Sequence, residues 1–174
     1  LSKELSLEKN VKVIAGCADH VVSAFSAGIK KSGDVLLKFG GAGDILISTE
    51  KPLNDQRLFL DFHIIPNLFM PNGCMASTGT MLNWFIKNFL FHSKIPESNI
   101  YSYLDKKASQ SNILNNKIII LPYFLGEKTP IHDVHAKGTI SGLGLNNTIY
   151  DLWIGFLEAV SFGFKHHLDV LCEN

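Results

Sequence analysis

The sequence predicts an α/β protein with a mixed sheet. Short apolar segments of strand length alternate with glycine-rich turns and with segments whose apolar residues recur at the helical period. Two strand candidates are separated only by a tight glycine turn, which is typical of a hairpin and argues against a purely parallel sheet. Hydrophobic residues make up 46% of the 174 residues and charged residues 18%, which is the composition of a globular protein with a sizeable core.

The first predicted elements are a buried strand and a helix rich in small residues. The strand covers residues 11–15, and Gly16-Cys-Ala-Asp19 then turns the chain. From Asp19 to Ile29 small and apolar residues dominate, which suits a helix that packs closely on a sheet. Asp19 stands where a helix N-cap is expected.

A hairpin and a further strand follow. Val35–Phe39 and Ile45–Ser48 are apolar segments of strand length on either side of the glycine turn Gly40-Gly-Ala-Gly-Asp44. Arg57–His63 alternates in part between polar and apolar residues, and this predicts another strand, which Pro66 ends.

The rest of the chain predicts three helices and one strand. Asn72-Gly73 predicts a turn, and apolar residues then recur at helical spacing from near Thr78-Gly79 to residue 90. Two further helices are predicted over Glu97–Ala108 and Asp151–Leu171. The remaining predictions are a buried strand over residues 117–122 and irregular segments over residues 109–116 and 123–148.

Charge and cysteine content exclude several classes of protein. Lys and Arg together number 16, as do Asp and Glu, so no excess charge favours nucleic acid or an anionic membrane as a partner. No apolar segment reaches the ~18–20 residues that a membrane-spanning helix needs. The three cysteines are far apart and form no Cys-x-x-Cys pair, which argues against a disulfide framework and favours the cytoplasm. His132, Asp133 and His135 fit no standard zinc spacing, so no metal ligand is assigned.

Asp19 is the candidate for acid–base chemistry. A carboxylate between the end of a strand and the start of a helix faces the crevice where α/β proteins place ligands. There it can accept a proton from a substrate hydroxyl that attacks phosphorus. The alternative is an N-cap that satisfies backbone N–H groups, and Asp19 taken alone favours the cap.

Two glycine-containing segments are candidates for phosphate binding. The turn with Gly40 and Gly41 lets the backbone approach phosphate oxygens and can gather N–H groups into an anion-binding nest. The helix start at Gly79, with Asn83 one turn further on, offers N–H donors and the positive end of the helix dipole. Taken alone, each segment is explained at least as well by a structural turn or a structural helix start.

In their order along the chain, these segments resemble the FGGY carbohydrate kinases, the family of xylulose, ribulose, gluconate and glycerol kinases. The family pattern is Gly-Gly-x-Asp, Gly-Thr-Ser-Gly, Gly-x-x-x-x-Trp, Pro-x-x-x-Gly-Glu-Arg-x-Pro, Gly-x-x-x-Gly-Leu and Glu-Gly-Val/Ile. The corresponding segments here are Gly16–Asp19, Gly40–Gly43, Gly79–Trp84, Pro122–Pro130, Gly138–Leu143 and Glu158–Val160. The resemblance covers nearly the whole chain.

The resemblance implies two actin-like, ribonuclease-H-like domains with a cleft between them, of which this chain is an internal part. Residues 1–30 would end the N-terminal, substrate-binding domain, and residues 31–174 would form the first part of the C-terminal, nucleotide-binding domain. Asp19 matches the catalytic base, and His20 matches a position that contacts substrate in some members. The nucleotide-binding positions of the family match Gly40, Gly41, Gly79 and Asn83. ATP and Mg²⁺ are the implied cofactors, and a homodimer is possible.

Departures from the family pattern qualify what it implies. Gly41-Ala42 replaces the usual Thr-Ser of the turn, so a hydroxyl that could bind a phosphate oxygen is missing. Lys128 replaces Arg, and Ala159 replaces Gly. The N-terminal Asp-x-Gly-Thr loop and the later glycine-rich adenine segment of the family are not in this sequence. We therefore expect this polypeptide alone to have no kinase activity.

Three functions remain open from the sequence. The favoured one is ATP-dependent phosphoryl transfer to a sugar or polyol by the full-length protein, with Asp19 as the base. The second is a non-catalytic sugar- or nucleotide-binding pseudokinase of the same fold, for which the Gly41-Ala42 departure speaks. The third is an unrelated α/β binding module whose glycine turns are only structural. The sequence does not distinguish among sugars.

Overall fold

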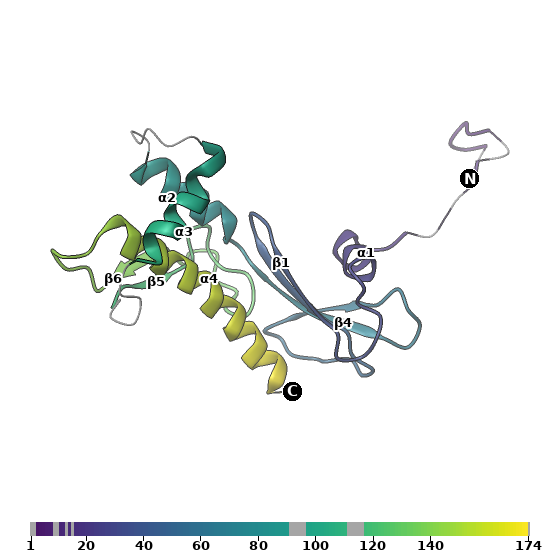
Figure 1. Ribbon diagram of the computed structural model, residues 1–174. Coiled ribbons are helices and arrows are strands. Elements are labelled where there is room, and N and C mark those ends of the chain that lie inside the picture. Colours follow the sequence, from purple (N-terminus) through teal and green to yellow (C-terminus); the bar gives the residue numbers. More distant parts are fainter. Residues whose placement is uncertain are drawn as a thin grey trace.

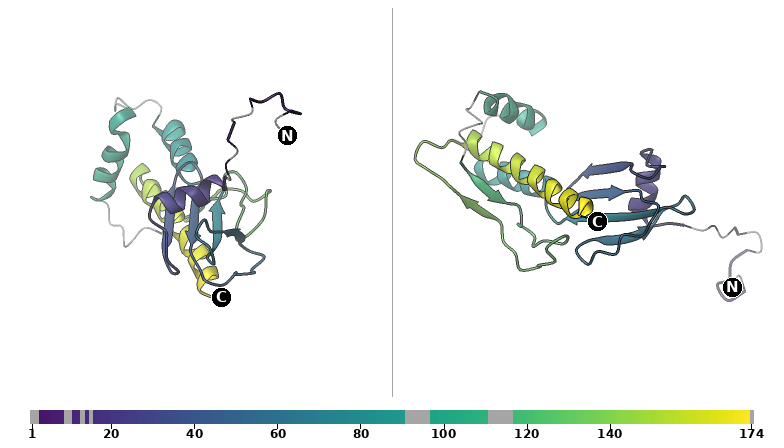
Figure 2. Two further views of the ribbon diagram at one scale, coloured as in Figure 1. Left: turned by 90° about the vertical axis from the view of Figure 1, so that its right-hand side faces the viewer. Right: turned by 90° about the horizontal axis from the view of Figure 1, so that it is seen from below.

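A computed structural model describes residues 3–8, 11–12, 14, 16–90, 97–110 and 117–173. An antiparallel sheet lies beside a second group of helices and strands (Figure 1). The long helix α4 (Ile149–Cys172) begins in this second group and runs toward the sheet. The described residues 3–8 lie away from both parts (Figure 2). Among the described residues, no helix is long and apolar enough to cross a membrane.

The larger sheet has four strands in the order β1-β2-β4-β3. All of its ladders are antiparallel, and so is the ladder of the two-stranded sheet. The strands are β1 (Val35–Phe39), β2 (Gly43–Ile47), β3 (Phe59–Phe62), β4 (Phe69–Met75), β5 (Ile119–Leu121) and β6 (Thr139–Ser141). The predicted hairpin around the glycine turn is therefore confirmed as β1 and β2.

A helix packs on each face of the four-stranded sheet. Successive residues of a strand point to opposite faces, and Ile45 and Leu46 of β2 are both buried. Leu46 packs in a small core with Val21 and Ala24 of α1 (Asp19–Ser26), whereas Ile45 belongs to the main core that includes α4. The sheet therefore lies between α1 and α4, and the face toward α1 carries the candidate site.

The main core gathers aromatic rings from α2 and α4. Phe85 of α2 (Gly79–Phe89) has its ring centroid 4.9 Å from that of Phe156 and 5.7 Å from that of Trp153. All three side chains are buried, and burial of each large apolar side chain contributes roughly 1.5–3 kcal/mol. The Trp153 indole N–H donates to Asp105 of α3 (Ile100–Ala108) at 2.8 Å, which ties α3 to the same core. A short 3₁₀ helix, Glu97–Asn99, precedes α3.

The start of α4 is fixed by a capping box. The Thr148 hydroxyl accepts the backbone N–H of Asp151, and the Asp151 carboxylate accepts the backbone N–H of Thr148 at 2.7 Å. Two N–H groups that the helix itself leaves without acceptors are satisfied in this way.

Thr148→Ala is expected to loosen the first turn of α4. Loss of such a cap costs about 1 kcal/mol, which corresponds to roughly fivefold faster local opening. Hydrogen exchange of the full-length protein, followed by mass spectrometry on peptides from the start of α4, measures it. Ser161→Ala is the control, because its hydroxyl donates only to the Leu157 carbonyl within the helix. Equal exchange in both variants would show that the cap contributes nothing.

Two predictions at the strand level are wrong. Asn72-Gly73 is not a turn but lies inside β4, which is paired on both sides with β2 and β3. Gly73 is required there because a Cβ atom would lie 2.2 Å from Cδ2 of the buried His167 ring on α4. The predicted strand over 11–15 is not formed at residues 11, 12 and 14, and residues 13 and 15 lie outside the described residues. Val11 and Ile14 are exposed, so no packing favours an extended pairing there.

The other elements agree closely with the sequence prediction. Helices α2, α3 and α4 lie within a few residues of their predicted ranges. The strand predicted over 117–122 is β5. Its partner β6 lies inside the segment 123–148, for which the sequence predicts irregular structure. The prediction missed β6 because a strand of three residues is too short to show a hydrophobic pattern. Of the loop predicted over 109–116, residues 111–116 lie outside the described residues.

Candidate functional site

A cleft of about 290 Å³ opens on the face of the sheet that carries α1. Its walls combine the first residues of α1 with side chains from all four strands of the larger sheet. The lining residues are Asp19, His20, Lys38, Asp44, Leu46, Phe59, Asn72 and Cys74. Strand register explains this gathering, because Asp44 pairs with Lys38 on one side and with Cys74 on the other, so the three side chains share one face.

Asp19 is the first residue of α1 and lies at the cleft with an exposed carboxylate. Ala18 occupies the N-cap position, and among the described residues no side chain makes a cap hydrogen bond there, so the predicted N-cap position of Asp19 is wrong, although its carboxylate does accept one backbone N–H. One carboxylate oxygen, Oδ1, accepts the backbone N–H of His20 at 2.7 Å and lies 3.3 Å from Nδ1 of the same residue. The hydrogen bonds from the His20 side chain and backbone lower the pKa of Asp19 below its ordinary value, which keeps it ionised.

His20 connects Asp19 to a second carboxylate that the sequence prediction missed. Its Nε2 lies 2.8 Å from Oδ2 of Asp61 on β3, and the Asn72 side-chain amide donates to the same oxygen at 2.7 Å. The hydrogen bond with Asp61, aided by that with Asp19, raises the pKa of His20 against the opposing effect of burial. The only feature of the sequence that could have indicated Asp61 is that it interrupts an otherwise apolar strand. No local pattern relates Asp61 to His20.

A cation and a thiol complete the cleft. Lys38 Nζ lies 3.2 Å from Oδ2 of Asp44, across the β1–β2 ladder. Burial raises the pKa of the Cys74 thiol to about 11, so the nucleophilic thiolate is not populated near neutral pH. The cleft is therefore equipped for proton transfer at its carboxylates and His20, not for thiolate chemistry.

The predicted nucleotide-binding glycines are close together, at the tip of the β1–β2 hairpin and the start of α2. Thr78, Gly79 and Thr80 donate their backbone N–H groups to the carbonyls of Gly40 and Gly41 at 2.9–3.1 Å. A Cβ atom on Gly79 would lie 2.5 Å from the Gly40 carbonyl oxygen, so this approach requires glycine. The N–H donors that the sequence offered to phosphate at the helix start are thus used by the hairpin.

The hairpin tip has two other donors without an acceptor among the described residues. Gly40 donates its N–H to the Ala42 carbonyl at 2.9 Å, whereas the N–H groups of Gly41 and Ala42 have no acceptor in the part of the chain that the structure describes. Asn83 lies on the exposed side of α2, one turn beyond Gly79, where its side-chain carbonyl accepts the Tyr101 hydroxyl at 2.6 Å. One residue pair, Phe39 and Gly43, separates the tip from Lys38 and Asp44 on the β1–β2 ladder, which places the tip near the cleft.

A buried network supports this region from behind. Glu127 is buried, which raises its pKa, and its Oε1 accepts the backbone N–H of Ala76 at 2.8 Å, just ahead of α2. Thr129 Oγ1 accepts the backbone N–H of Cys74 at 2.6 Å and lies 2.9 Å from His167 Nε2. Burial lowers the pKa of His167, so this link between the loop, β4 and α4 is neutral. These contacts fix the loop over 126–130 to the end of β4.

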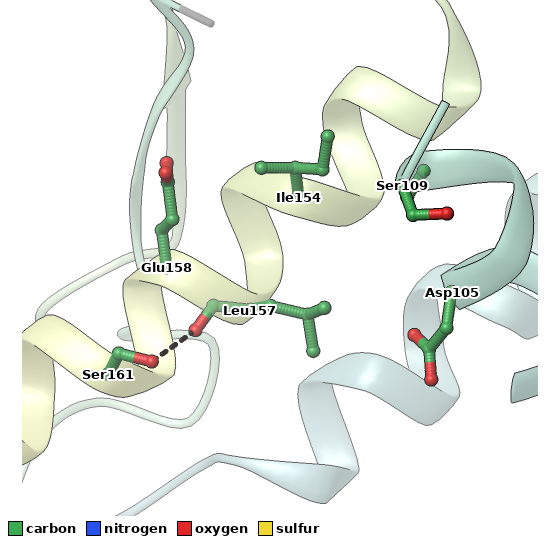
Figure 3. Close-up of a pocket in the computed structure, with 7 residues that line it drawn as sticks. Asp105, Ser109, Ile154, Leu157, Glu158 and Ser161 are labelled. Atoms are coloured by element: carbon green, nitrogen blue, oxygen red, sulfur yellow. Dashed lines mark hydrogen bonds between the residues drawn. The ribbon is translucent and has the colours of Figure 1, made fainter. Parts of the chain in front are cut away.

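A second hollow, of about 370 Å³, lies between α3 and α4 (Figure 3). The residues that line it include Ile154 and Leu157, and none of the predicted site residues is among them. Ser161 donates to the Leu157 carbonyl, and Asp105 accepts the Trp153 indole N–H, so these polar groups serve the helices themselves. Within the described ranges, no three His, Cys, Asp or Glu side chains lie close enough to hold a metal ion.

Comparisons with known proteins agree with the fold and with the sequence motifs. Residues 39–174 match the FGGY family of carbohydrate kinases, C-terminal domain. The chain is 30% identical over 164 residues to xylulose kinase of Haemophilus influenzae, covering 93% of the chain and 31% of that protein. It is 26% identical over 173 residues to xylulose kinase of Staphylococcus epidermidis, covering 98% of the chain and 34% of that protein.

Solved structures give the same result. The xylulose kinase from Rhodospirillum rubrum is 43% identical with a TM-score of 0.84, covering 99% of this chain and 34% of that one. A Plasmodium falciparum glycerol kinase with ADP, 19% identical, has the same fold with a TM-score of 0.72 over 89% of this chain and 30% of its own. The chain thus has the actin-like, ribonuclease-H-like fold and spans about a third of the length of these relatives. Because the family model matches most of its length, the chain belongs to the FGGY family of carbohydrate kinases.

Proposed function

We propose that the full-length protein transfers the γ-phosphoryl group of ATP to a hydroxyl of a sugar or polyol. The observation that carries this proposal is the exposed Asp19 carboxylate, which shares a cleft with Lys38 next to an exposed glycine turn. Residues 1–30 would end the substrate-binding domain, and residues 31–174 would begin the nucleotide-binding domain. A ketopentose is the first acceptor to test, because relatives are named xylulose kinases.

Asp19 is suited to accept the proton of the attacking hydroxyl. Its Oδ1 is engaged by His20, whereas Oδ2 has no hydrogen-bond partner among the described residues and is available to a substrate in the cleft that Asp19 lines. A carboxylate with a lowered pKa is a weak base, but the hydroxyl becomes acidic as its oxygen bonds to phosphorus, so a weak, correctly placed base suffices. Because Asp19 must be ionised, activity would be lost as pH falls through its lowered pKa.

The hairpin tip fits the phosphates of ATP. The N–H groups of Gly41 and Ala42 have no acceptor among the described residues, and neither residue carries a side chain that would block a phosphate. Lys38 of β1, which is paired with Asp44, is a nearby cation of the cleft, two residues before Gly40. The described residues hold no group of three or more metal-ligating side chains, which agrees with a Mg²⁺ ion that enters with ATP and is bound mainly by phosphates and water.

A pseudokinase remains the second candidate. Ala42 offers no hydroxyl to a phosphate, and the first N–H groups of α2 are bound to the hairpin. Both features reduce the number of donors available to ATP relative to the family pattern. Such a protein would bind sugar or nucleotide without turnover.

ADP release by the full-length protein distinguishes the two candidates. The assay uses ATP with Mg²⁺ and a panel of ketopentoses, aldonates and polyols, and the 174-residue chain alone is assayed in parallel. We expect acceptor-dependent turnover by the full-length protein and none by the chain alone. Binding of ATP without turnover on any acceptor would support the pseudokinase. Turnover by the chain alone would contradict our expectation that activity also needs the family's Asp-x-Gly-Thr loop and adenine-binding segment, which this sequence lacks.

A further inference from the structure

The cleft contains a chain of hydrogen bonds that the proton transfer itself does not require. It runs from the Asn72 amide to Asp61, from Asp61 to His20 and from His20 to Asp19, with contacts of 2.7, 2.8 and 3.3 Å. Its members come from β4, β3 and α1, so tertiary packing alone assembles it.

Both ring nitrogens of His20 face carboxylate oxygens. Nδ1 faces Asp19 and Nε2 faces Asp61. A carboxylate only accepts hydrogen bonds, so both contacts are hydrogen bonds only when both nitrogens carry protons. A neutral ring would place a lone pair against one of the two carboxylates. The geometry therefore selects the imidazolium, and the raised pKa of His20 agrees with it.

We propose that Asp61 is a positioning residue, which holds His20 as an imidazolium so that His20 orients the Asp19 carboxylate for proton transfer. This inference rests on the proposed function in taking Asp19 as the proton acceptor. The Asn72 amide donates to the same Asp61 oxygen, Oδ2, that His20 contacts, and this second bond restricts the position of that oxygen. Asp19 itself is exposed, so without the bonded imidazolium its side chain has only the His20 backbone N–H to hold it.

The charges around His20 favour the cation. Asp61 and Asp19 are bonded to it, and Asp44 lines the same cleft, whereas Lys38 is the opposing cation and is paired with Asp44. The protonated thiol of Cys74 adds no charge. A histidine with a raised pKa stabilises the fold fully below its ordinary value of 6.5, and this contribution is lost as pH rises through its raised value. The orientation of Asp19 by the His20 imidazolium should be lost over the same pH range, in which His20 loses its proton.

Asp61→Asn in the full-length protein tests the inference. The substitution keeps the side-chain shape and removes the charge that holds His20 protonated. We expect kcat to fall on the order of 10- to 100-fold through misplacement of Asp19, and the alkaline limb of the kcat/KM pH profile to move to lower pH. Asp61→Glu, which keeps the charge, should keep most of the alkaline limb. Asp169→Asn, an exposed carboxylate on α4 paired with Lys165, is the matched control and should change neither quantity.

A double-mutant cycle separates positioning from a structural role. His20→Gln removes the titrating ring, so the alkaline limb should vanish, and Asp61→Asn should then cause no further fall in kcat. The His20 pKa is followed in parallel by NMR of ¹³C-histidine-labelled full-length protein, with the resonance assigned from its absence in His20→Gln. It should decrease in Asp61→Asn.

Each outcome decides one of the two claims. Suppose that Asp19→Asn inactivates the enzyme but Asp61→Asn has the kcat and the alkaline limb of the wild type. This result would overturn the positioning role of Asp61 and leave the proposed function intact. So would a fall in unfolding stability with an unchanged pH profile, because that is what a merely structural Asp61 would give. A wild-type protein that is inactive with every acceptor would instead overturn the proposed function and with it the part of Asp61 in proton transfer.

Discussion

Asp19→Asn is expected to reduce the kcat of the full-length protein by about 10²–10⁴-fold, the usual contribution of a positioned general base. The amide keeps the side-chain shape and an oxygen that can still accept the His20 backbone N–H, so α1 and the cleft should be unchanged. What is lost is the charge and basicity at Oδ2. KM for the acceptor should change little, since the effect lies mainly in the transition state. Steady-state kinetics on the best acceptor of the panel measures both constants.

Asp34→Asn is the matched control for this substitution. The Asp34 carboxylate also accepts backbone N–H groups, those of Lys30 and Lys31 at 2.9 Å, and these bonds likewise lower its pKa. It lies in the turn ahead of β1 and does not line the cleft. A small loss of stability with normal kcat is expected. If Asp19→Asn retained kcat within a few-fold of the control, Asp19 would not be the base, and the pseudokinase or another acceptor would have to be considered.

Gly79→Ala is expected to separate the hairpin tip from α2. The added Cβ would lie 2.5 Å from the Gly40 carbonyl oxygen, which is backbone and has no side-chain rotamer to yield. Overpacking of this kind costs about 1–3 kcal/mol of stability. The hydrogen bonds from Thr78, Gly79 and Thr80 to the tip would also be strained, which would displace the N–H groups of Gly41 and Ala42. Both the urea midpoint and the affinity for ATP should therefore fall.

Gly144→Ala provides the comparison. A Cβ at this position would meet only Asn147 Oδ1, at the ordinary distance of 3.6 Å, and the N–H bond to that oxygen would be kept. Urea unfolding and ATP titration of both full-length variants show the difference. Reduced stability with normal ATP affinity in Gly79→Ala would mean that the hairpin tip is not the phosphate site. Unchanged stability would contradict the packing itself.

The residues of the candidate site that belong to a local sequence motif could be predicted from the sequence. Asp19, His20 and the glycines at 40, 41 and 79 were identified from local patterns and from the family resemblance. Asp61 was not, because it lies 41 residues from His20 and its neighbourhood predicts only a strand. Asn72 was misassigned for a related reason: Asn-Gly is a strong local turn signal, but here Asn72 binds Asp61 and Gly73 admits the His167 ring.

The chemical meaning of the helix start at Gly79 also depended on the tertiary structure. Its sequence indicates free N–H donors at a positive helix end. The fold directs these donors to the Gly40 and Gly41 carbonyls, so that the N–H groups without an acceptor among the described residues are at the tip of the hairpin and not at the helix start. A local pattern identifies which groups exist but not which partner takes them.

The sequence by itself determined the helices, the β1–β2 hairpin and the family, because hydrophobic period, glycine turns and the order of motifs are local properties of the chain. The tertiary structure alone decided that β4 is a central strand, that Asp19 is an exposed helix residue instead of a cap, and that Asp61 holds His20. The pairing of β4 and the contact between Asp61 and His20 depend on residues distant in sequence. Such contacts exist only after the sheet has fixed its register and α1 and α4 have packed on its two faces.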